Sequence, residues 1–138
     1  MLHLYSFLFV MYYFRVEDSN SLFWFGLAEW GNTLAQFGTK PRDQVLKRER
    51  LALEDNHWYT ASVQVRGDHI TCELRDRDKK LTQFTIDDSR HPMGRVGLRT
   101  CCSEVRFRNI RVTAPDGKIL WEGPPDLPVK PTWVPTKP

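Results

Sequence analysis

The side chains that most often carry out chemistry are thinly spread along this sequence. Glu29, Glu73 and Glu104 stand singly in strand-like runs, without a second carboxylate at the spacing of a catalytic pair, and each is most simply a solvated strand residue. His57 and His91 lie in turn-like stretches, and neither adjoins a serine or cysteine nucleophile in a triad-like arrangement. A role of His57 as a base stays open, but the chain has no recognisable catalytic motif.

The cysteines and the acidic loop residues are weak candidates for a metal site. Cys72, Cys101 and Cys102 form no disulfide framework and lack the spacing of zinc ligands. Neighbouring strand residues point to opposite faces, so at most one of Cys101 and Cys102 can enter the core. The acidic residues available for calcium at a loop rim are Asp18, Asp76 and Asp78. They supply fewer ligands than calcium requires, so we expect no cofactor, with calcium as the open alternative.

Charge and hydropathy exclude two classes of partner. The net charge of the 138 residues is +3, and lysines and arginines alternate with acids, as in residues 47–55. This mixing is typical of a solvated surface and not of a nucleic-acid groove. The apolar residues 1–14 lack a preceding basic segment, are followed by no cleavage site, and end at Arg15, too soon to cross a bilayer. We therefore expect no nucleic acid or membrane partner, and no export signal.

Alternating apolar and polar residues predict an all-β domain. The expected strands cover residues 7–16, 22–30, 45–53, 58–66, 69–75, 81–86, 95–101, 104–112 and 119–121. Residues 31–44 contain Gly, Asn, Thr and Pro and are expected to form a long loop. Short strands separated by frequent turns are typical of an antiparallel β-sandwich.

Three local patterns refine this prediction. Gly67 and Asp68 fit a two-residue hairpin loop. Residues 114–118, Ala-Pro-Asp-Gly-Lys, fit a tight turn in which proline presets the backbone and glycine allows a positive φ. The apolar alternation slips by one near Arg108 and Asn109, which a β-bulge would absorb.

The same alternation predicts the core and an uncovered face. The two facing layers are expected to bury Phe25, Val63, Val65, Leu98 and Phe107. In residues 22–30, one face carries Phe23, Phe25 and Leu27 and suits the core. The opposite face carries Leu22, Trp24, Gly26, Ala28 and Trp30, and another element or a ligand must cover it.

Four segments, in order, resemble the bacterial 3-keto-disaccharide hydrolase domain family. They read FRVEDSNSLFWFGLAEWGNT (14–33), NHWYTASVQVRGDHITCEL (56–74), HPMGRVGLRT (91–100) and VRFRNIRVTAPDGKILWEGPPDLP (105–128). The resemblance covers about residues 7–128. It implies a concanavalin A-like lectin/glucanase fold, a jelly-roll sandwich that is similar to laminin-G domains.

The resemblance also bears on the ends of the domain. Domains of this family have further strands before the position of Phe7, so the fold is expected to be incomplete at the N-terminus. Either the chain is a fragment of a longer protein with additional domains, or it is a short form with an open sheet edge. We expect residues 1–123 to form the partial domain and the proline-rich residues 124–138 to form a tail or linker.

For function, the resemblance implies a saccharide partner on a concave sheet face. Such a site uses aromatic rings as platforms and amide, carboxylate and guanidinium groups for hydroxyls. The candidates are Trp24, Glu29, Trp30, Asn32, Arg66 and Arg99. The Glu-x-Asp-x-x-Glu signature of the superfamily's glucanases is absent. Three readings stay open: a carbohydrate-recognition module, a 3-keto-glycoside hydrolase, and a structural domain that binds other proteins.

Overall fold

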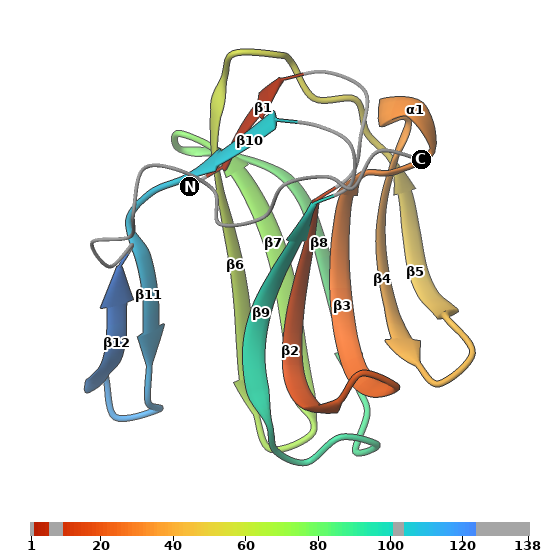
Figure 1. The fold of residues 1–138 in the computed structure, drawn as a ribbon, viewed down its shortest axis with the longest axis vertical. Coiled ribbons are helices and arrows are strands. Elements are labelled where there is room, and N and C mark those ends of the chain that lie inside the picture. Colours follow the sequence, from red (N-terminus) through yellow and green to blue (C-terminus); the bar gives the residue numbers. More distant parts are fainter. Residues whose placement is uncertain (1, 6–9, 101–103, 124–138) are drawn as a thin grey trace, which may run out of the picture. The chain divides into compact units, whose positions relative to one another are not determined.

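The computed structural model describes residues 2–5, 10–100 and 104–123, and these are nearly all antiparallel β structure (Figure 1). The prediction of an all-β protein is confirmed. The chain divides into two compact units, Met1–Arg106 and Phe107–Pro138. Over the described ranges, none of the helical structure is long and apolar enough to span a bilayer.

Two five-stranded sheets make up the larger unit (Figure 1). In the first sheet the order is β10 (Glu104–Phe107), β1 (Leu2–Tyr5), β6 (Trp58–Arg66), β7 (His69–Asp76) and β8 (Lys79–Asp87). In the second sheet it is β5 (Gln44–Arg50), β4 (Leu34–Lys40), β3 (Ser21–Ala28), β2 (Val10–Asp18) and β9 (Arg95–Thr100). One short turn of helix, α1 (Glu29–Asn32), joins β3 to β4.

The hairpin of β6 and β7 forms as its alternation predicts. Tyr59 is buried and Thr60 exposed, and the pattern of more and less covered residues continues to Arg66. Gly67, with φ +62°, and Asp68 close the loop, and Arg66 pairs with His69. Cys72 lies fully buried in β7, where burial raises the pKa of its thiol. Cys101 and Cys102 lie outside the described residues.

Aromatic rings of the second sheet form the centre of the core. Phe14, Phe23 and Phe37 lie within 6.0 Å of one another, measured between ring centroids. Phe25 meets Phe84 of β8 edge to face at 6.1 Å, so this face of the second sheet is turned towards the first. Such ring pairs contribute about 0.5–1.5 kcal/mol beyond the area they bury.

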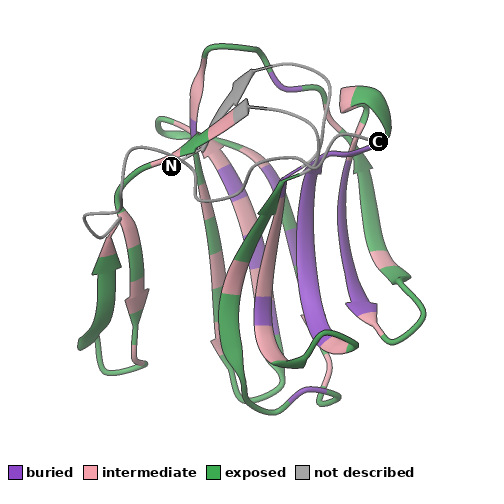
Figure 2. Cartoon of the chain, viewed as in Figure 1, coloured by how far each residue is buried: buried purple, intermediate pink, exposed green. Residues whose placement is uncertain are grey.

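β3 is buried on both faces. All residues from Leu22 to Ala28 are buried, and Figure 2 shows β3 and β4 as continuous buried strands, with the largely exposed β5 beside β4 and the partly buried β2 beside β3. Of the second face that the sequence predicts for residues 22–30, Leu22, Trp24, Gly26 and Ala28 are buried, whereas Trp30 is 74% exposed.

The prediction of a long loop over residues 31–44 is wrong. After α1, Leu34–Lys40 form β4, which pairs with β3 from Leu22↔Lys40 to Gly26↔Gln36. Residues 41–43 make only a short turn into β5. Glycine, asparagine and threonine here serve close packing and the α1 turn. Leu34–Lys40 form a strand because they pair with β3.

The predicted bulge at Arg108 and Asn109 is also wrong, because the chain changes sheets there. β10 ends at Phe107, Asn109 adopts φ +53°, and β11 (Ile110–Thr113) pairs with β12 (Ile119–Gly123) in a separate two-stranded sheet. In the turn, Gly117 has φ +89° and donates to the carbonyl of Ala114, while Lys118 N donates to Asp116 Oδ1. The turn at residues 114–118 is thus confirmed.

The predicted core is correct at its centre and wrong at one edge. Phe25 is fully buried, whereas Val63 and Val65 are half-buried. Leu98 of the edge strand β9 is 43% exposed, because an edge strand has a neighbour on one side only. Phe107 is half-buried and begins the second unit.

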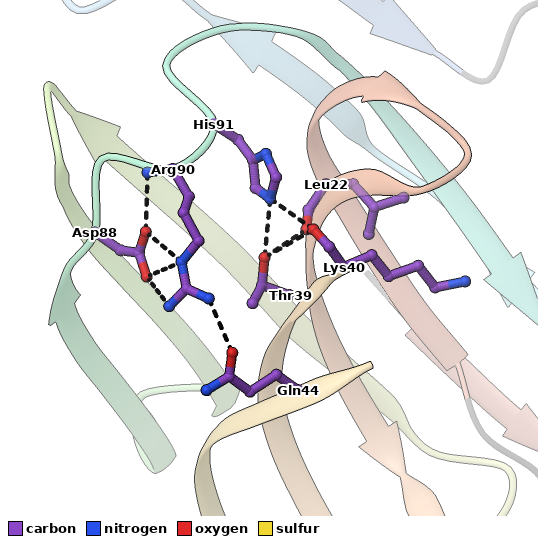
Figure 3. Close-up of polar contacts among 7 residues, drawn as sticks. All are labelled: Leu22, Thr39, Lys40, Gln44, Asp88, Arg90 and His91. Carbon is purple, nitrogen blue, oxygen red and sulfur yellow. Dashed lines mark hydrogen bonds and ion pairs between the residues drawn. The ribbon is translucent and has the colours of Figure 1, made fainter. Parts of the chain in front are cut away.

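A buried histidine fastens the link between β8 and β9 (Figure 3). His91 Nε2 lies 2.9 Å from both Thr39 Oγ1 and the Lys40 carbonyl oxygen, so this nitrogen carries a proton. The ring also meets Phe23 edge to face at 4.8 Å. These contacts give His91 a structural role.

Beside His91, Asp88 and Arg90 hold the same link (Figure 3). The carboxylate of Asp88 accepts hydrogen bonds from the backbone N–H and the guanidinium of Arg90. Burial favours the neutral acid, but the bonds from Arg90 outweigh it and lower the pKa of Asp88. Arg90 Nη1 also donates to Gln44 Oε1 of β5 at 3.0 Å.

Candidate functional site

The face of the second sheet that is turned away from the first carries a row of polar side chains, called here the Gly26 row. Strand pairing aligns Arg48 (β5), Gln36 (β4), Gly26 (β3), Met11 (β2) and Arg99 (β9). Paired residues of an antiparallel sheet share one face, so these side chains project together. The adjacent row runs through Gly38, Trp24, Tyr13 and Gly97.

The α1 turn brings Glu29 onto this face. Ala28, Trp30 and Asn32 have φ of 57°, 52° and 60°, and Gly31 has φ 66°, so the turn is left-handed. Each non-glycine residue in this conformation costs about 1–2 kcal/mol. Such strain persists only where the surrounding structure holds it, and it gathers at functional sites.

Asn32 supplies much of that hold. Its Nδ2 donates to the Leu53 carbonyl at 2.6 Å, and its Oδ1 accepts from the Leu53 N–H at 2.8 Å. Leu51 N donates to the Thr33 carbonyl at 3.0 Å. Asn32 therefore anchors the turn to the segment after β5, and its polar atoms are engaged in that anchor.

The carboxyl group of Glu29 lies directly over Gly26. A Cβ atom built on Gly26 would come 2.2 Å from Glu29 Oε1, so glycine leaves the space that the carboxyl fills. Glu29 is 7% exposed, and Oε1 has no hydrogen-bond partner among the described residues. Burial raises the pKa of Glu29 from 4.5 to about 7, against the opposing charge of Arg99. A carboxyl of this kind holds or releases a proton near neutral pH.

Donor groups flank Glu29 along the row. With the Gln36 amide oxygen turned towards β5, it accepts from Arg48 Nε at 2.9 Å and Nη2 at 3.1 Å. On the other side, Arg99 Nη1 donates to the Tyr13 hydroxyl at 3.0 Å. Both guanidinium groups thus sit in defined positions on the exposed edge strands.

The two tryptophan candidates have different environments. Trp24 is 4% exposed, and its indole ring fills the space over Gly38, where a Cβ would come 2.2 Å from Cζ2. Its ring therefore cannot serve as an open platform for a sugar. Trp30 is 74% exposed and follows Glu29 directly. The expectation that both share one strand face is wrong, because the left-handed turn intervenes between them.

Of the six candidates, the structure brings Trp24, Glu29 and Arg99 onto one face, with Trp30 and Asn32 in the adjoining turn. Arg66 lies apart, exposed on β6 of the first sheet. The simplest reading of Glu29, a solvated strand residue, is wrong. Sequence reasoning missed Tyr13, Gln36 and Arg48, which strand register alone reveals.

A second polar cluster surrounds His57. Its Nε2 lies 2.9 Å from Asp76 Oδ1, and its ring packs 4.7 Å from the ring of Tyr59. Tyr59 Oη accepts from the Glu54 N–H at 2.8 Å, and burial raises the pKa of this tyrosine. The cluster joins the end of β7 to the start of β6, and the contacts described for it include no serine or cysteine. Within the described ranges, no three acidic, histidine or cysteine side chains gather as metal ligands.

Comparison with known proteins returns no family model, no curated protein and no solved structure that matches this chain.

Proposed function

We propose that the chain is a carbohydrate-recognition module with a concanavalin A-like β-sandwich fold, in which the outer face of the second sheet binds a saccharide. The proposal depends above all on one observation: a buried carboxyl group without a described partner lies in the middle of a row of guanidinium and amide groups. Sugar hydroxyls both donate and accept hydrogen bonds, so they match this mixture of groups.

Trp30 completes the proposed site. Its exposed indole follows Glu29, where it can cover the apolar face of a pyranose ring bound against the carboxyl. Because Glu29 is buried, binding requires a shift of the α1 turn that uncovers its carboxyl. Glu29 and Arg99 then contact hydroxyls, while Asn32 positions the turn. The resemblance of residues 14–33, 56–74, 91–100 and 105–128 to the 3-keto-disaccharide hydrolase domains also supports a saccharide ligand.

The test is calorimetric titration of the full chain with ligands selected on a glycan array. Trp30→Ala and Glu29→Gln should each weaken binding by about tenfold, the effect of losing one good stacking or hydrogen-bonding contact. Arg66→Gln, on the other sheet, serves as the matched control and should bind like the parent. Absence of saccharide binding, or equal affinity of all four proteins, would reject the proposal and favour a structural domain that binds other proteins.

A second candidate is hydrolysis of a 3-keto-glycoside, favoured by the pKa of Glu29 near 7. Among the described residues of the Gly26 row and of the adjacent row through Trp24, Glu29 is the one carboxyl. A mechanism with two carboxylates therefore lacks its second carboxylate there. Incubation with a 3-keto-disaccharide tests this candidate. Release of monosaccharide by the parent and not by Glu29→Gln would support it, and no release by the parent would reject it.

A further inference from the structure

The buried position of the Glu29 carboxyl suits its neutral form and not its ionised form. Glu29 is 7% exposed, and its Oε1 has no hydrogen-bond partner among the described residues. A neutral carboxyl in this position forgoes one hydrogen bond, whereas an ionised one is a charge removed from water, which is far less favourable. The closed position of the α1 turn, with this carboxyl beneath it, therefore fits the protonated acid.

Gly26 leaves the space that the carboxyl occupies. A Cβ atom on Gly26 would come 2.2 Å from Glu29 Oε1 and 3.1 Å from Cδ. Met11 and Gln36, the strand partners of Gly26, are both uncharged. The atoms that fill the space are the far end of a flexible side chain. The carboxyl can therefore leave the space without a movement of β3.

Charged and titratable groups face Glu29 from three strands of the second sheet. They are Arg99 of β9, Tyr13 of β2, and Arg48 and Arg50 of β5. Burial raises the pKa of Glu29 to about 7, against the attraction of Arg99 for the ionised form. The segment anchored by Asn32 carries two more acids, Glu54 and Asp55, and the Glu54 carboxylate lies 3.8 Å from His57 Nδ1. Burial thus outweighs the nearest opposite charge.

The backbone of the α1 turn is strained and is held by few contacts. Its left-handed non-glycine residues, each at a cost of about 1–2 kcal/mol, are Ala28, Trp30 and Asn32. Thr33 N donates to the Glu29 carbonyl at 3.0 Å, and Thr33 Oγ1 donates to the Trp30 carbonyl at 2.8 Å. A Cβ on Gly31 would meet no atom within 4 Å, so the middle of the turn is not packed against the sheet. Opening would release this strain.

We propose that the α1 turn is a proton-controlled lid over the outer face of the second sheet, closed while Glu29 is neutral and opened when its carboxyl releases the proton to solvent. Opening carries the carboxylate into water and uncovers the space over Gly26. The lid itself needs no ligand. Its control of a saccharide site rests on the proposed function, and that site then becomes accessible as the pH rises through neutrality.

Amide hydrogen exchange of the full chain without ligand tests the lid, measured by NMR at pH 5 and pH 8 and corrected for the intrinsic rate at each pH. The amides of Thr33, Leu51 and Leu53 report on the lid, because each donates a hydrogen bond within the turn or between the turn and its anchor. With a pKa of 4.5 in the open turn and about 7 in the closed one, the opening equilibrium constant rises on the order of 70-fold between these pH values. Protection of the three amides should fall by that factor, and protection in β7 should stay constant.

Two substitutions set the lid to one state, and a third is the matched control. Glu29→Gln has no charge to release, so the three amides should keep their protection at both pH values. Gly26→Ala places a Cβ where the carboxyl lies, so protection should be low at both pH values. Gly97→Ala makes the same change on the same face with its nearest atom at 3.8 Å, and should behave like the parent.

Three results would overturn the lid. One is equal protection of the parent at pH 5 and pH 8. Another is an equal fall in Glu29→Gln, because a different group would then control exchange. The third is an equal fall in β7, because the whole unit would then be opening. A pH-dependent lid in a protein that binds no saccharide would support this inference and reject the proposed function, so the two are tested separately.

Discussion

Replacing Glu29 by glutamine should stabilise the protein above neutral pH and leave its stability unchanged in acid. Burial raises the pKa of Glu29 from 4.5 to about 7 in the folded protein. Between about pH 4.5 and pH 7 the folded state binds more protons than the unfolded state, so the free energy of unfolding falls as the pH rises. Above about pH 7 both states are ionised, and the full cost of the buried charge is present.

The size of this effect follows from the shift. A difference of roughly 2.5 pKa units at about 1.4 kcal/mol per unit gives about 3 kcal/mol. Glutamine has nearly the same shape and no charge, so Glu29→Gln should be more stable than the parent by about 3 kcal/mol at pH 8. The two proteins should coincide at pH 4, where the parent carboxyl is protonated in both states.

Urea denaturation followed by tryptophan fluorescence, repeated at each pH from 4 to 8, measures the difference. Arg66→Gln, an exposed change on the other sheet, controls for general effects of substitution. A stability difference that stays constant across this range would refute the reasoning. A parent more stable than Glu29→Gln at pH 8 would also refute it, because the carboxylate would then have a stabilising partner.

Three further substitutions, one of them with a matched control, test the contacts that hold the second sheet and the α1 turn. Gly38→Ala should destabilise the protein by about 3 kcal/mol in denaturant titration, because its Cβ meets the buried Trp24 ring at 2.2 Å, whereas Gly97→Ala, with 3.8 Å to its nearest neighbour, should change stability little. His91→Ala should cost about 2–4 kcal/mol through lost packing and an unpaired Lys40 carbonyl, and equal stability of variant and parent would contradict the structural role of this ring. Asn32→Ala should cost about 2 kcal/mol and speed amide hydrogen exchange in residues 28–33, and unchanged exchange would show that the turn does not depend on this anchor.

Local patterns predict those parts of the fold that local interactions decide. The β6–β7 hairpin follows from alternation and a Gly67-Asp68 loop, and the turn before β12 follows from Pro115, Asp116 and Gly117. In both places, the residues that form the turn also set the register of the strands they join. The local sequence is therefore sufficient to predict these two turns and the strands that they join.

Strand β4 and the change of sheet after β10 depend on distant partners. Leu34–Lys40 carry Gly38 at the point where the Trp24 ring from the neighbouring strand must fit. Read alone, that glycine indicates a loop; read beside β3, it indicates close packing. Similarly, the slip at Asn109 has the same local signature whether the chain bulges or leaves the sheet.

The candidate site could be predicted in part. Glu29, Trp30 and Arg99 are polar or aromatic residues at strand ends and edges, and their types alone make them candidates. The burial of Glu29 depends on Ala28 adopting a left-handed conformation, which alanine does not favour by itself. Gln36 and Arg48 enter the site only through strand pairing, so sequence reasoning had no signal for them.

The most direct test of the central claim, a saccharide site around Glu29, is an NMR titration of the full chain with a saccharide selected on a glycan array. The account predicts shift changes at the Trp30 indole N–H and at backbone amides of α1, β2 and β9, with small changes on β6, β7 and β8. Changes confined to the first sheet or to the β11–β12 hairpin, or no changes at saturating sugar, would contradict it.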